Sequence, residues 1–447
     1  MNRNVDVLVV GGCTAGLYFG GLMAAQGYKV LVCDKDTEDK IGSRYTVIHV
    51  GRQYFDSFGI PEPKPGDSDY VTSFNTSILL SARNCFPKTR TVPTLVVLRH
   101  GLMRRIGNWA KDKGAELLFG AEFKEPIFDE KRRLAGAVLS CGSEELQIGA
   151  RLVADASGFP AVVRTSLPEN YGIETFKVGP ESLSFLILHY VKLKNPEKDR
   201  VNSVTTWCPY HIWLAPSNDP GPRGTLIGVG TGQSYENAER SLKEFLAKGF
   251  LPEYDLDFIE KSNNCRHRSL LNFTADGFVA LGDAACVINP KNGEAVPVGW
   301  RHGSIAADTA GRAMKDGAYP LKEKLWALNP RFMKDQGAVY AMEFASRTAA
   351  SCHSPEEIDY MFEHSILYRD EKEAAGNLTL KLFKAQLSGG LSRESVRNIK
   401  TALSLGKKIY KHYMAYPESP ESFGAWVEKA HNLWEEAQAL PGADVPY

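Results

Sequence analysis

The stretch Val5-Asp-Val-Leu-Val-Val-Gly-Gly-Cys-Thr-Ala-Gly16 opens a strand, turn, helix and strand unit that ends at Asp34. Residues 5–10 are a short β-branched run, typical of a strand buried on both faces. The glycine-containing turn follows, and the small and apolar residues 17–26 predict a helix packed closely on a sheet, before a second strand over 29–33. The unit therefore predicts an α/β fold organised around its first turn.

The turn also predicts a nucleotide site. Glycine stands at Gly11 and Gly16, but Cys13 takes the middle position of the usual G-x-G-x-x-G spacing, where a bare backbone lets N–H groups approach a pyrophosphate. Cysteine is small, so this approach is strained but not excluded. Asp34 follows the second strand, where an acidic side chain would accept the ribose hydroxyls of an adenine nucleotide. An α/β unit without a ligand is the alternative interpretation of the turn taken alone.

The composition and the start of the chain argue against several classes of protein. The 447 residues allow two or three domains, and 53 basic against 53 acidic residues predict no nucleic-acid partner. The first strand begins too close to the start for a cleavable signal, so we expect a cytoplasmic protein. The longest apolar stretch is the nucleotide unit itself, a poor membrane span, which leaves peripheral contact with a bilayer open. Eight cysteines without a C-x-x-C pair predict reduced thiols and no metal site.

The rest of the chain alternates between recognisable patterns. A short apolar strand at 277–281 ends in Gly-Asp before a helix, which repeats the logic of the first unit. The other expected elements, in chain order, are a helix over 44–58, strands over 70–82 and 91–99, an amphipathic helix over 102–113, a β meander over 115–155, a strand-rich part over 182–230 with a loop at 217–224, helices over 234–248 and 299–314, and helical periodicity from 315 to 440.

Three separated stretches together resemble the FAD-dependent oxidoreductases of the glutathione-reductase type, in the branch that holds aromatic monooxygenases and geranylgeranyl reductases. The resemblance covers residues 5–310 and implies that the first unit binds the ADP half of FAD. Gly282-Asp-Ala-Ala285 matches the family's second motif, in which Asp283 would accept a ribityl hydroxyl. Residues 290–295 match the loop whose amides point at the flavin N1 and O2 edge and stabilise the anionic reduced flavin. A capped turn is the alternative for a lone Gly-Asp.

Two further positions enter through this resemblance. Asp155-Ala-Ser-Gly158, followed by residues 162–164, is similar to the family's Asp-Ala-Asp-Gly, so Asp155 is expected to brace the phosphate-binding region. Arg99 stands where the family has an arginine near the flavin phosphate or ribityl chain, although an exposed surface arginine is equally consistent. The expected cofactor-binding residues are Gly11, Gly12, Cys13, Thr14, Ala15, Gly16, Asp34, Lys35, Arg44, Arg99, Asp155, Gly282, Asp283, Pro290, Gly293, Glu294 and Ala295, which replaces a family glycine.

The choice within the branch depends on residues 211–230. His211-Ile-Trp-Leu-Ala-Pro216, followed by Ile227-Gly-Val-Gly230, resembles the Tyr-x-Trp-x-Phe-Pro and Asn-Val-Gly signature of geranylgeranyl reductases. In that family these residues line the cavity for an apolar, often isoprenoid, substrate. Trp213 and Pro216 alone could instead be ordinary core and turn residues. The family's Lys-x-Cys-Gly appears as residues 40–43 without a thiol, which puts a cysteine-assisted step in doubt.

The expected catalytic residues are His211, Tyr210 and Trp213. Trp213 would wall the pocket, and His211 would donate the proton that hydride addition to a double bond requires, because an ordinary histidine titrates near neutrality. A histidine satisfied within its strand is the alternative, and Tyr210 could then replace it as donor.

The resemblance implies an FAD-dependent oxidoreductase that reduces a carbon–carbon double bond of an apolar, isoprenoid-like, or small conjugated substrate by hydride transfer from reduced FAD. The alternatives are an aromatic monooxygenase and a non-catalytic flavin-binding regulator. The expected electron donor is NAD(P)H or a ferredoxin-like protein. The fold prediction is α/β, with a Rossmann-like FAD-binding domain (1–70, 92–175 and 265–325), an inserted antiparallel β substrate domain (71–91 and 176–264) and a helical carboxyl-terminal region (326–447).

Overall fold

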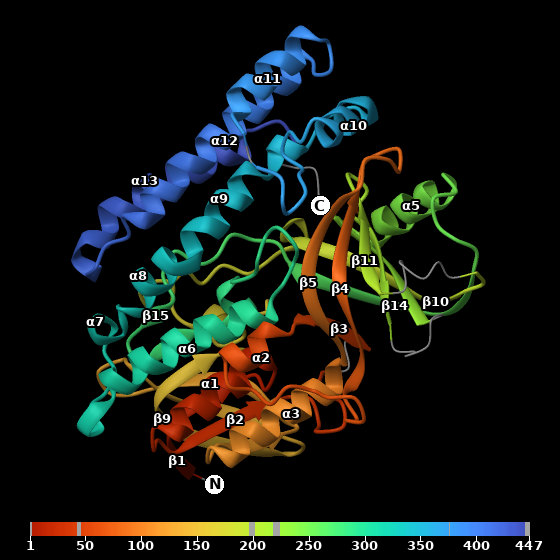
Figure 1. The fold of residues 1–447 in the computed structure, drawn as a ribbon. Helices are drawn as coiled ribbons and strands as arrows, with labels where there is room; N and C mark the ends of the chain where they lie inside the picture. The colour runs from red at the N-terminus through yellow and green to blue at the C-terminus, as the bar shows by residue number, and fades with distance from the viewer. Residues whose placement is uncertain (1, 43–45, 196–201, 218–223, 375, 443–447) are drawn as a thin grey trace.

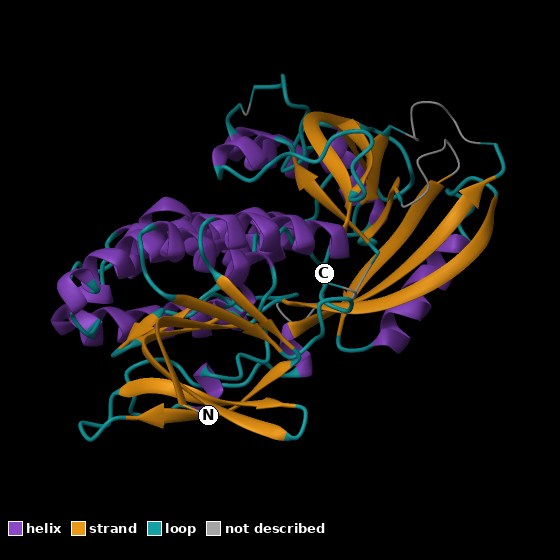
Figure 2. Ribbon diagram, turned by 90° about the horizontal axis from the view of Figure 1, so that it is seen from below, coloured by secondary structure: helices purple, strands orange, loops and turns teal. Residues whose placement is uncertain are grey.

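The computed structural model describes residues 2–42, 46–195, 202–217, 224–374 and 376–442. The expected elements at 43–45 and 218–223 lie outside these ranges. Among the described residues the chain forms two eight-stranded sheets, here called sheet A and sheet B, and a carboxyl-terminal layer of helices (Figures 1 and 2). This arrangement confirms the α/β fold predicted from the sequence, with a parallel sheet, a mostly antiparallel sheet and a helical end.

Sheet A carries the nucleotide-binding unit. Its parallel strands β16, β9, β1, β2 and β6 are adjacent in that order, and β15, β7 and β8 extend it by antiparallel pairing. Its strands are β1 (Asn2–Val10), β2 (Val30–Asp34), β6 (Glu116–Phe119), β7 (Ala121–Phe128), β8 (Leu134–Cys141), β9 (Glu144–Asp155), β15 (Thr274–Ala275) and β16 (Phe278–Ala280). The β-branched runs of β1 and β2 are buried, as expected for central parallel strands covered on both faces.

Sheet B follows the order β14-β10-β13-β12-β11-β4-β5-β3, and every pair is antiparallel except β11 with β4. Its strands are β3 (Val47–Gly51), β4 (Tyr70–Leu80), β5 (Lys88–Leu98), β10 (Leu183–Leu193), β11 (Ser203–Trp207), β12 (Ile212–Pro216), β13 (Gly224–Gly232) and β14 (Tyr254–Cys265). One face packs on α5 (Tyr235–Leu246) through the cluster of Trp207, Ile227 and Phe245. The opposite face holds Phe74, Leu188 and Leu226.

The helix predicted over 44–58 is wrong. Residues 47–51 form the edge strand β3, which pairs with β5, and only Gln53–Ser57 is helical (α2). The apolar spacing at 47, 50, 54 and 58 fits a helix, but Val47, Ile48 and Val50 are β-branched residues that favour a strand, and pairing with β5 decides the outcome. Sheet B therefore includes residues 47–51 and 92–98, which the predicted domain division gives to the FAD-binding part.

Helices fill the remaining layers. The helices α1 (Thr14–Ala25) and α3 (Arg99–Asp112) pack on sheet A, and α6 (Val296–Ala313) packs on α1. The carboxyl-terminal layer contains α7 (Lys322–Leu325), α8 (Leu328–Phe332), α9 (Ala338–Ser346), α10 (Pro355–Glu363), α11 (Leu378–Leu387), α12 (Arg393–Met414) and α13 (Phe423–Gln438). Figure 1 shows α9, α12 and α13 stacked beside one another, away from sheet B. None of the helices in the described ranges is long and apolar enough to cross a membrane.

Candidate functional site

The motifs predicted to bind the cofactor meet at one edge of sheet A. Val10 lies opposite Cys33 and Asp155 across the sheet, and Asp155 lies opposite Ala280, so the carboxyl ends of β1, β2, β9 and β16 are adjacent. Ligands of parallel α/β sheets bind outside this edge. The sequence motifs after these four strands, far apart in the chain, therefore form one surface.

The first turn leaves no room for side chains at its two glycines. A Cβ built on Gly11, whose φ is +108°, would lie 2.2 Å from the Ala156 carbonyl oxygen. A Cβ on Gly16 would lie 1.9 Å from the Gly11 carbonyl oxygen. Cys13 stands between them as the N-cap of α1, half-buried, and its side chain does not cap the helix. The backbone N–H groups that open α1 are therefore placed where the sequence predicts an anion site.

Asp34 is held beside this turn. Its Oδ2 accepts the Gly12 N–H at 2.6 Å and its Oδ1 accepts the Asp36 N–H at 2.9 Å. A carboxylate has about four acceptor positions, so these two bonds fix its orientation and leave capacity for ribose hydroxyls. Burial raises the pKa of Asp34, and the Asp36 and Gly12 N–H groups oppose that effect. Lys35, the next residue, is exposed.

Asp155 organises the turn after β9 from a fully buried position. The Asp155 Oδ1 accepts hydrogen bonds from the Ser157 N–H at 3.0 Å and from the Ser157 hydroxyl at 2.6 Å. The Asp155 Oδ2 accepts the Arg164 backbone N–H at 2.7 Å. Ser157, which replaces the family's second acid, thus bonds to the first. Burial raises the pKa of Asp155, although these hydrogen bonds act against it. The carboxylate braces the backbone next to Gly11.

The Gly-Asp motif packs directly on the first turn. Residues 282–285 form a short 3-10 helix, and a Cβ on Gly282 would lie 2.9 Å from the Ala15 Cβ. Asp283 is half-buried, whereas Gly282, Ala284 and Ala285 are buried, so its side chain is the one that reaches the surface of this short helix. The structure thus brings together two motifs that lie more than 260 residues apart.

The loop at 290–295 differs from expectation in its amides. Gly293 donates its N–H to the Asn289 carbonyl at 2.9 Å, and Glu294 donates its N–H to Asn292 Oδ1 at 3.0 Å. These two amides are therefore engaged within the loop. The donors that this segment offers to a cofactor come from the first turn of α6, just after Ala295, where helix geometry provides no acceptor. Pro290 and Ala295 are both half-buried, and burial raises the pKa of Glu294.

Arg99 opens α3 and turns back toward the loop after β2. Its Nη1 donates to the Gly42 carbonyl at 3.2 Å, and its N–H donates to the Thr46 carbonyl at 2.9 Å. Arg99 therefore anchors both sides of the undescribed residues 43–45. Arg44, an expected cofactor residue, lies among them and outside the described residues.

Arg164 is a site residue that the sequence analysis left without a role. Its side chain is fully buried, and its Nε donates to the Ala284 carbonyl at 3.0 Å. Its Nη1 donates to the Glu174 and Phe176 carbonyls at 2.8 and 2.9 Å. Arg164 thereby fixes the Gly-Asp helix against the turn after β9. The sequence feature that could have identified Arg164 is its position nine residues after Asp155, at the end of the motif that Asp155 begins.

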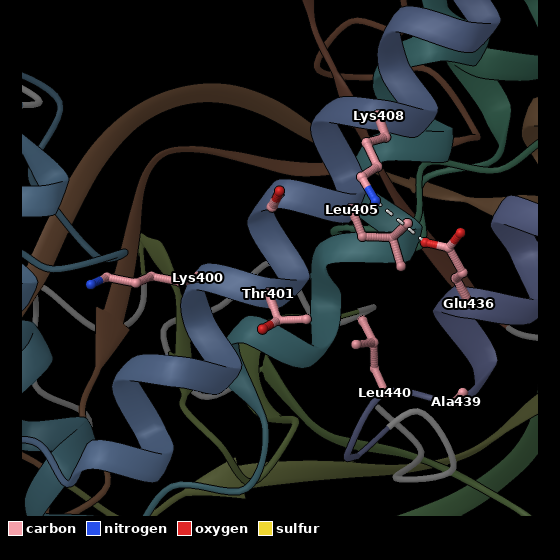
Figure 3. Close-up of a pocket in the computed structure, with 8 residues that line it drawn as sticks. Lys400, Thr401, Leu405, Lys408, Glu436, Ala439 and Leu440 are labelled. Carbon is pink, nitrogen blue, oxygen red and sulfur yellow. Dashed lines mark ion pairs between the residues drawn. The ribbon is translucent and has the colours of Figure 1, made fainter.

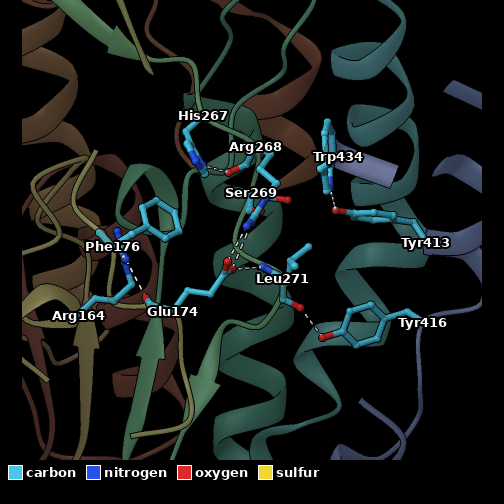
Figure 4. Close-up of polar contacts among 10 residues, drawn as sticks. All are labelled: Arg164, Glu174, Phe176, His267, Arg268, Ser269, Leu271, Tyr413, Tyr416 and Trp434. Atoms are coloured by element: carbon cyan, nitrogen blue, oxygen red, sulfur yellow. Dashed lines mark hydrogen bonds and ion pairs between the residues drawn. The ribbon is translucent and has the colours of Figure 1, made fainter. Parts of the chain in front are cut away.

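A half-buried ion pair links this region to the carboxyl-terminal helices (Figure 4). The Glu174 carboxylate accepts Arg268 Nη2 at 2.6 Å and the Leu271 N–H at 2.6 Å, and the Tyr416 hydroxyl donates to the Leu271 carbonyl at 2.6 Å. Burial acts to raise the pKa of Glu174, but the Arg268 guanidinium and its hydrogen bonds outweigh it and hold the pKa below its ordinary value. The helical layer is therefore connected to the cofactor side of the fold.

Two cysteines meet behind the Gly-Asp helix. Cys265 ends β14 and Cys286 follows residues 282–285, and both are buried. Their side chains interact: Cys286 raises the pKa of Cys265, whereas Cys265 and His267 lower the pKa of Cys286. Neither cysteine was expected at the site, because they lie 21 residues apart in the sequence. In the described part of the chain no cluster of three or more potential metal ligands is found.

His211 and Tyr210 occupy the turn between β11 and β12. His211 has a φ of +52°, and burial together with the charge of Arg266 lowers its pKa to about 4. The expectation that this histidine titrates near neutrality is therefore wrong. The Tyr210 hydroxyl donates to the Ala82 carbonyl at 2.9 Å, and its ring packs 5.3 Å from Phe245 of α5. Tyr210 thus lies on the α5 side of sheet B with its hydroxyl already engaged.

Trp213 lies flat across β13. A Cβ on Gly228 would lie 2.2 Å from its indole ring, and one on Gly230 would lie 3.7 Å from it. Trp213 is partly buried and belongs to the cluster on the face of sheet B opposite α5. The glycine at 228 is therefore explained by the space that Trp213 needs, whereas a Cβ on Gly230 would first meet the Leu186 side chain, at 2.8 Å.

The residues present fit an FAD molecule. Along the carboxyl edge of sheet A, Asp34 follows β2, the close-packed first turn follows β1, and the outward Asp283 follows β16. This matches the order of groups in FAD, because Asp34 would hold the adenosine ribose, the N–H groups of α1 the pyrophosphate, and Asp283 the ribityl chain.

Comparison with known proteins identifies the family of this chain. Residues 4–303 match the family model described as FAD binding domain. The chain is 24% identical to a digeranylgeranylglycerophospholipid reductase of Sulfolobus acidocaldarius, over 96% of this chain and 97% of that protein. It is 25% identical to the protein of the same name from Haloferax volcanii, over 70% and 77%.

Solved structures show the same fold. A geranylgeranyl bacteriochlorophyll reductase-like protein from Thermoplasma acidophilum superposes with a TM-score of 0.73 at 15% identity, over 90% of this chain and all of that one. A flavin-dependent brominase superposes with a TM-score of 0.60 at 16% identity, over 96% of this chain and all of that one. At these identities the likeness concerns the fold alone.

Proposed function

The chain belongs to the FAD-binding domain family, and we propose that this FAD-dependent oxidoreductase reduces a carbon–carbon double bond of an apolar, isoprenoid-like substrate. Two reductases whose name specifies a geranylgeranyl phospholipid resemble it, one over almost its full length. Trp213, Pro216 and the glycines at 228 and 230 match the geranylgeranyl reductase signature and support the same subfamily.

One observation carries the proposal. The loop at 290–295 and the His211 turn lie at the same end of sheet B. A Cβ on Gly293 would lie 3.9 Å from Asn264 Nδ2 of β14, and Arg266, two residues further, acts electrostatically on His211. The Gly230 N–H donates to the His211 carbonyl at 3.2 Å. The segment expected beside the flavin ring thus borders the segment expected beside the substrate.

Bound FAD supplies a carrier that accepts two electrons and delivers them as a hydride. The protein contributes fixed dipoles and shape. The N–H groups of α1 neutralise phosphate charge, and the first turn of α6 offers its positive end beside Ala295. Both are preorganised, because Asp155 and Arg164 hold the intervening turns by buried hydrogen bonds.

Trp213 is proposed to orient the substrate. A large rigid aromatic wall favours an apolar chain over water, and Ala215 beside it is smaller than the family's phenylalanine. The site is therefore roomier than the family signature implies, which suits a branched or conjugated substrate.

His211 is proposed as a positioning residue rather than an acid. With its pKa lowered to about 4, its imidazole is neutral at pH 7 and can hydrogen-bond without carrying a mobile proton. Tyr210 already donates to Ala82, so we assign the proton that completes the product to water. His211→Asn should then leave the pH profile of substrate reduction unchanged between pH 5.5 and 8, while lowering its amplitude at every pH.

The electron donor, NAD(P)H or a ferredoxin-like protein, remains a prediction. The aromatic monooxygenase is the second candidate, but neither of the two reductases above bears such a name.

The test compares variants on the substrate wall. Enzyme reduced without oxygen is mixed with a geranylgeranyl phospholipid in detergent, and flavin reoxidation is followed by absorbance. Gly228→Ala should displace the Trp213 ring and slow reoxidation about tenfold or more, because small misplacements at an oriented site cost much rate. Trp213→Phe should be milder, and both should retain FAD. Equal rates in the wild type and Gly228→Ala would remove Trp213 from the site.

A further inference from the structure

The charge of this otherwise neutral chain is strongly concentrated near its end. Residues 376–415 hold six lysines and two arginines against one glutamate, a net charge of +7, whereas the whole chain has a formal net charge of zero. These residues form α11 and α12. A local excess of this size marks a surface for a negatively charged partner.

The cations of α12 lie on one face of the helix. The exposed members are Arg393, Arg397, Lys400, Lys407, Lys408 and Lys411. Their spacing places them within one stripe, because residues three, four, seven and eleven apart share a helix face. The opposite face, including Val396, Ile399 and Ile409, is buried against the protein. This basic stripe extends from Arg393 to Lys411, roughly 27 Å at 1.5 Å per residue.

Helix α11 adds an exposed apolar stripe. Leu380, Phe383 and Leu387 are 49%, 60% and 78% exposed, and their spacing puts them on one face. Lys384 is exposed among them, whereas Leu382 and Ala385 are buried in the cluster on the other side. Three large apolar side chains exposed together on one short helix, beside a cation, form a pattern typical of helices that lie in a membrane interface.

The basic stripe borders a groove between α12 and α13 (Figure 3). The groove has a volume of about 510 Å³ and is lined on the α12 side by Lys400, Thr401, Ser404 and Lys408. Lys408 also faces Glu436 of α13 at 3.6 Å. Ammonium and hydroxyl groups are donors that phosphate oxygens accept. Glu436 also lines the groove and already pairs with Lys408, so the cations left for lipid phosphates are those along the open part of the stripe.

We propose that α11 and α12 form the surface by which this protein docks on an anionic lipid bilayer. The apolar stripe of α11 enters the headgroup region, and the basic stripe of α12 binds lipid phosphates. A nucleic acid would use the cations but leave Leu380, Phe383 and Leu387 in water, so the combination favours a membrane. The proposal is independent of the proposed reaction, although an apolar substrate would be reached from such a position.

The test measures sedimentation of the FAD-loaded protein with extruded vesicles. We expect binding to vesicles of phosphatidylcholine with one-quarter phosphatidylglycerol, little binding to phosphatidylcholine alone, and loss of binding at high salt. Lys400→Gln, Lys407→Gln and Lys411→Gln combined should weaken binding about 100-fold. Leu380→Ser, Phe383→Ser and Leu387→Ser combined should weaken it about tenfold.

The matched control is Leu256→Ser with Ile259→Ser. These β14 side chains are 50% and 49% exposed but lie on sheet B, so vesicle binding should not change. Circular dichroism and retained FAD absorbance show that each variant is folded. Equal binding to neutral and anionic vesicles, or no effect of either set of variants, would overturn the proposal. So would a dimer that dissociates in the α11 variant, or a duplex DNA bound more tightly than vesicles through the same lysines.

Discussion

The carboxyl edge of sheet A is proposed to bind the cofactor, and the strands β12 and β13 of sheet B are proposed to bind the substrate. The two regions restrict their amino-acid sequences in different ways. At the edge of sheet A the backbone itself is packed to contact, as at Gly11 against Ala156, and the required residue types are nearly unique. In sheet B a side chain covers the backbone, as where the Trp213 ring lies over Gly228, and the ring can move when a neighbouring residue changes. Cofactor binding is therefore fixed by local motifs, whereas substrate choice is distributed over a sheet.

The largest effect that this difference predicts is at Gly11. Gly11→Ala places a Cβ against the Ala156 carbonyl at a strained φ, and no flexible side chain can move away. We expect the variant to lose FAD entirely and to melt well below the wild type, as measured by flavin absorbance and calorimetry. Gly27→Ala is the control, because its φ is +87° but nothing lies within 4 Å. Full FAD content in Gly11→Ala would contradict the packing argument.

The next effect concerns the charge of Asp34. Asp34→Ala removes an acceptor for the ribose and also releases the Gly12 N–H, so FAD affinity should fall by roughly 1.5 to 3 kcal/mol, about 10- to 100-fold. Titration of apoprotein with FAD measures this change. Asp39→Ala, at an exposed position five residues on, should bind FAD as the wild type does. Finding FMN as the flavin that restores the holoprotein would contradict the assignment of this ribose site.

A third prediction uses a buried histidine on the sheet A side. His302 lies between Phe273 and Phe332, neither ring nitrogen has a hydrogen-bond partner among the described residues, and burial lowers its pKa to about 3. The folded protein then binds fewer protons than the unfolded chain between about pH 3 and the ordinary histidine value of 6.5. The contribution of the neutral His302 ring to the free energy of unfolding is therefore fully present above pH 6.5 and is lost as the pH falls.

Between pH 7 and pH 5 this one group should cost about 2 kcal/mol of unfolding free energy. Urea titration at the two pH values should show that His302→Leu loses about that much less than the wild type. His431→Leu, on the exposed face of α13, should lose as much as the wild type. An identical pH dependence in all three proteins would mean that His302 is protonated or solvated in the fold.

The smallest effect is expected at Cys13. Cys13→Gly restores the usual glycine where the backbone approaches the pyrophosphate, so FAD affinity should stay the same or rise by a few fold. In the wild type, bound FAD should protect this half-buried thiol from alkylation, as peptide mass spectrometry can measure. Equal labelling of the apoprotein and holoprotein would show that the turn does not contact the cofactor.

The success of the sequence predictions also differs between the two sheets. The first turn, Asp34, Asp155 and Asp283 could be recognised because each follows a strand whose pattern is local, and the structure brings them to one edge. The strand β3 was missed because its partner β5 lies about 40 residues away, and the spacing of its apolar residues also fits a helix. Propensity cannot decide between the two without the partner.

The chemistry of buried groups could not be predicted from sequence either. The pKa of His211 depends on its burial and on Arg266, 55 residues further along the chain. The link from Arg164 to Ala284 and the contact of Cys265 with Cys286 likewise depend on tertiary packing. A sequence motif can identify a local turn whose backbone binds a ligand. The surroundings that set the pKa of a side chain come from distant segments, so a motif does not reveal them.

The central claim is that this flavoprotein adds hydrogen to a double bond. The most direct measurement is the mass of the product formed when the photoreduced holoprotein is mixed, without oxygen, with a geranylgeranyl phospholipid. The account predicts reoxidation of one flavin for each double bond reduced, and a product heavier by two hydrogen atoms. A reaction that proceeds only when oxygen is admitted, and that yields a product heavier by one oxygen atom, would contradict it and assign the chain to the monooxygenases.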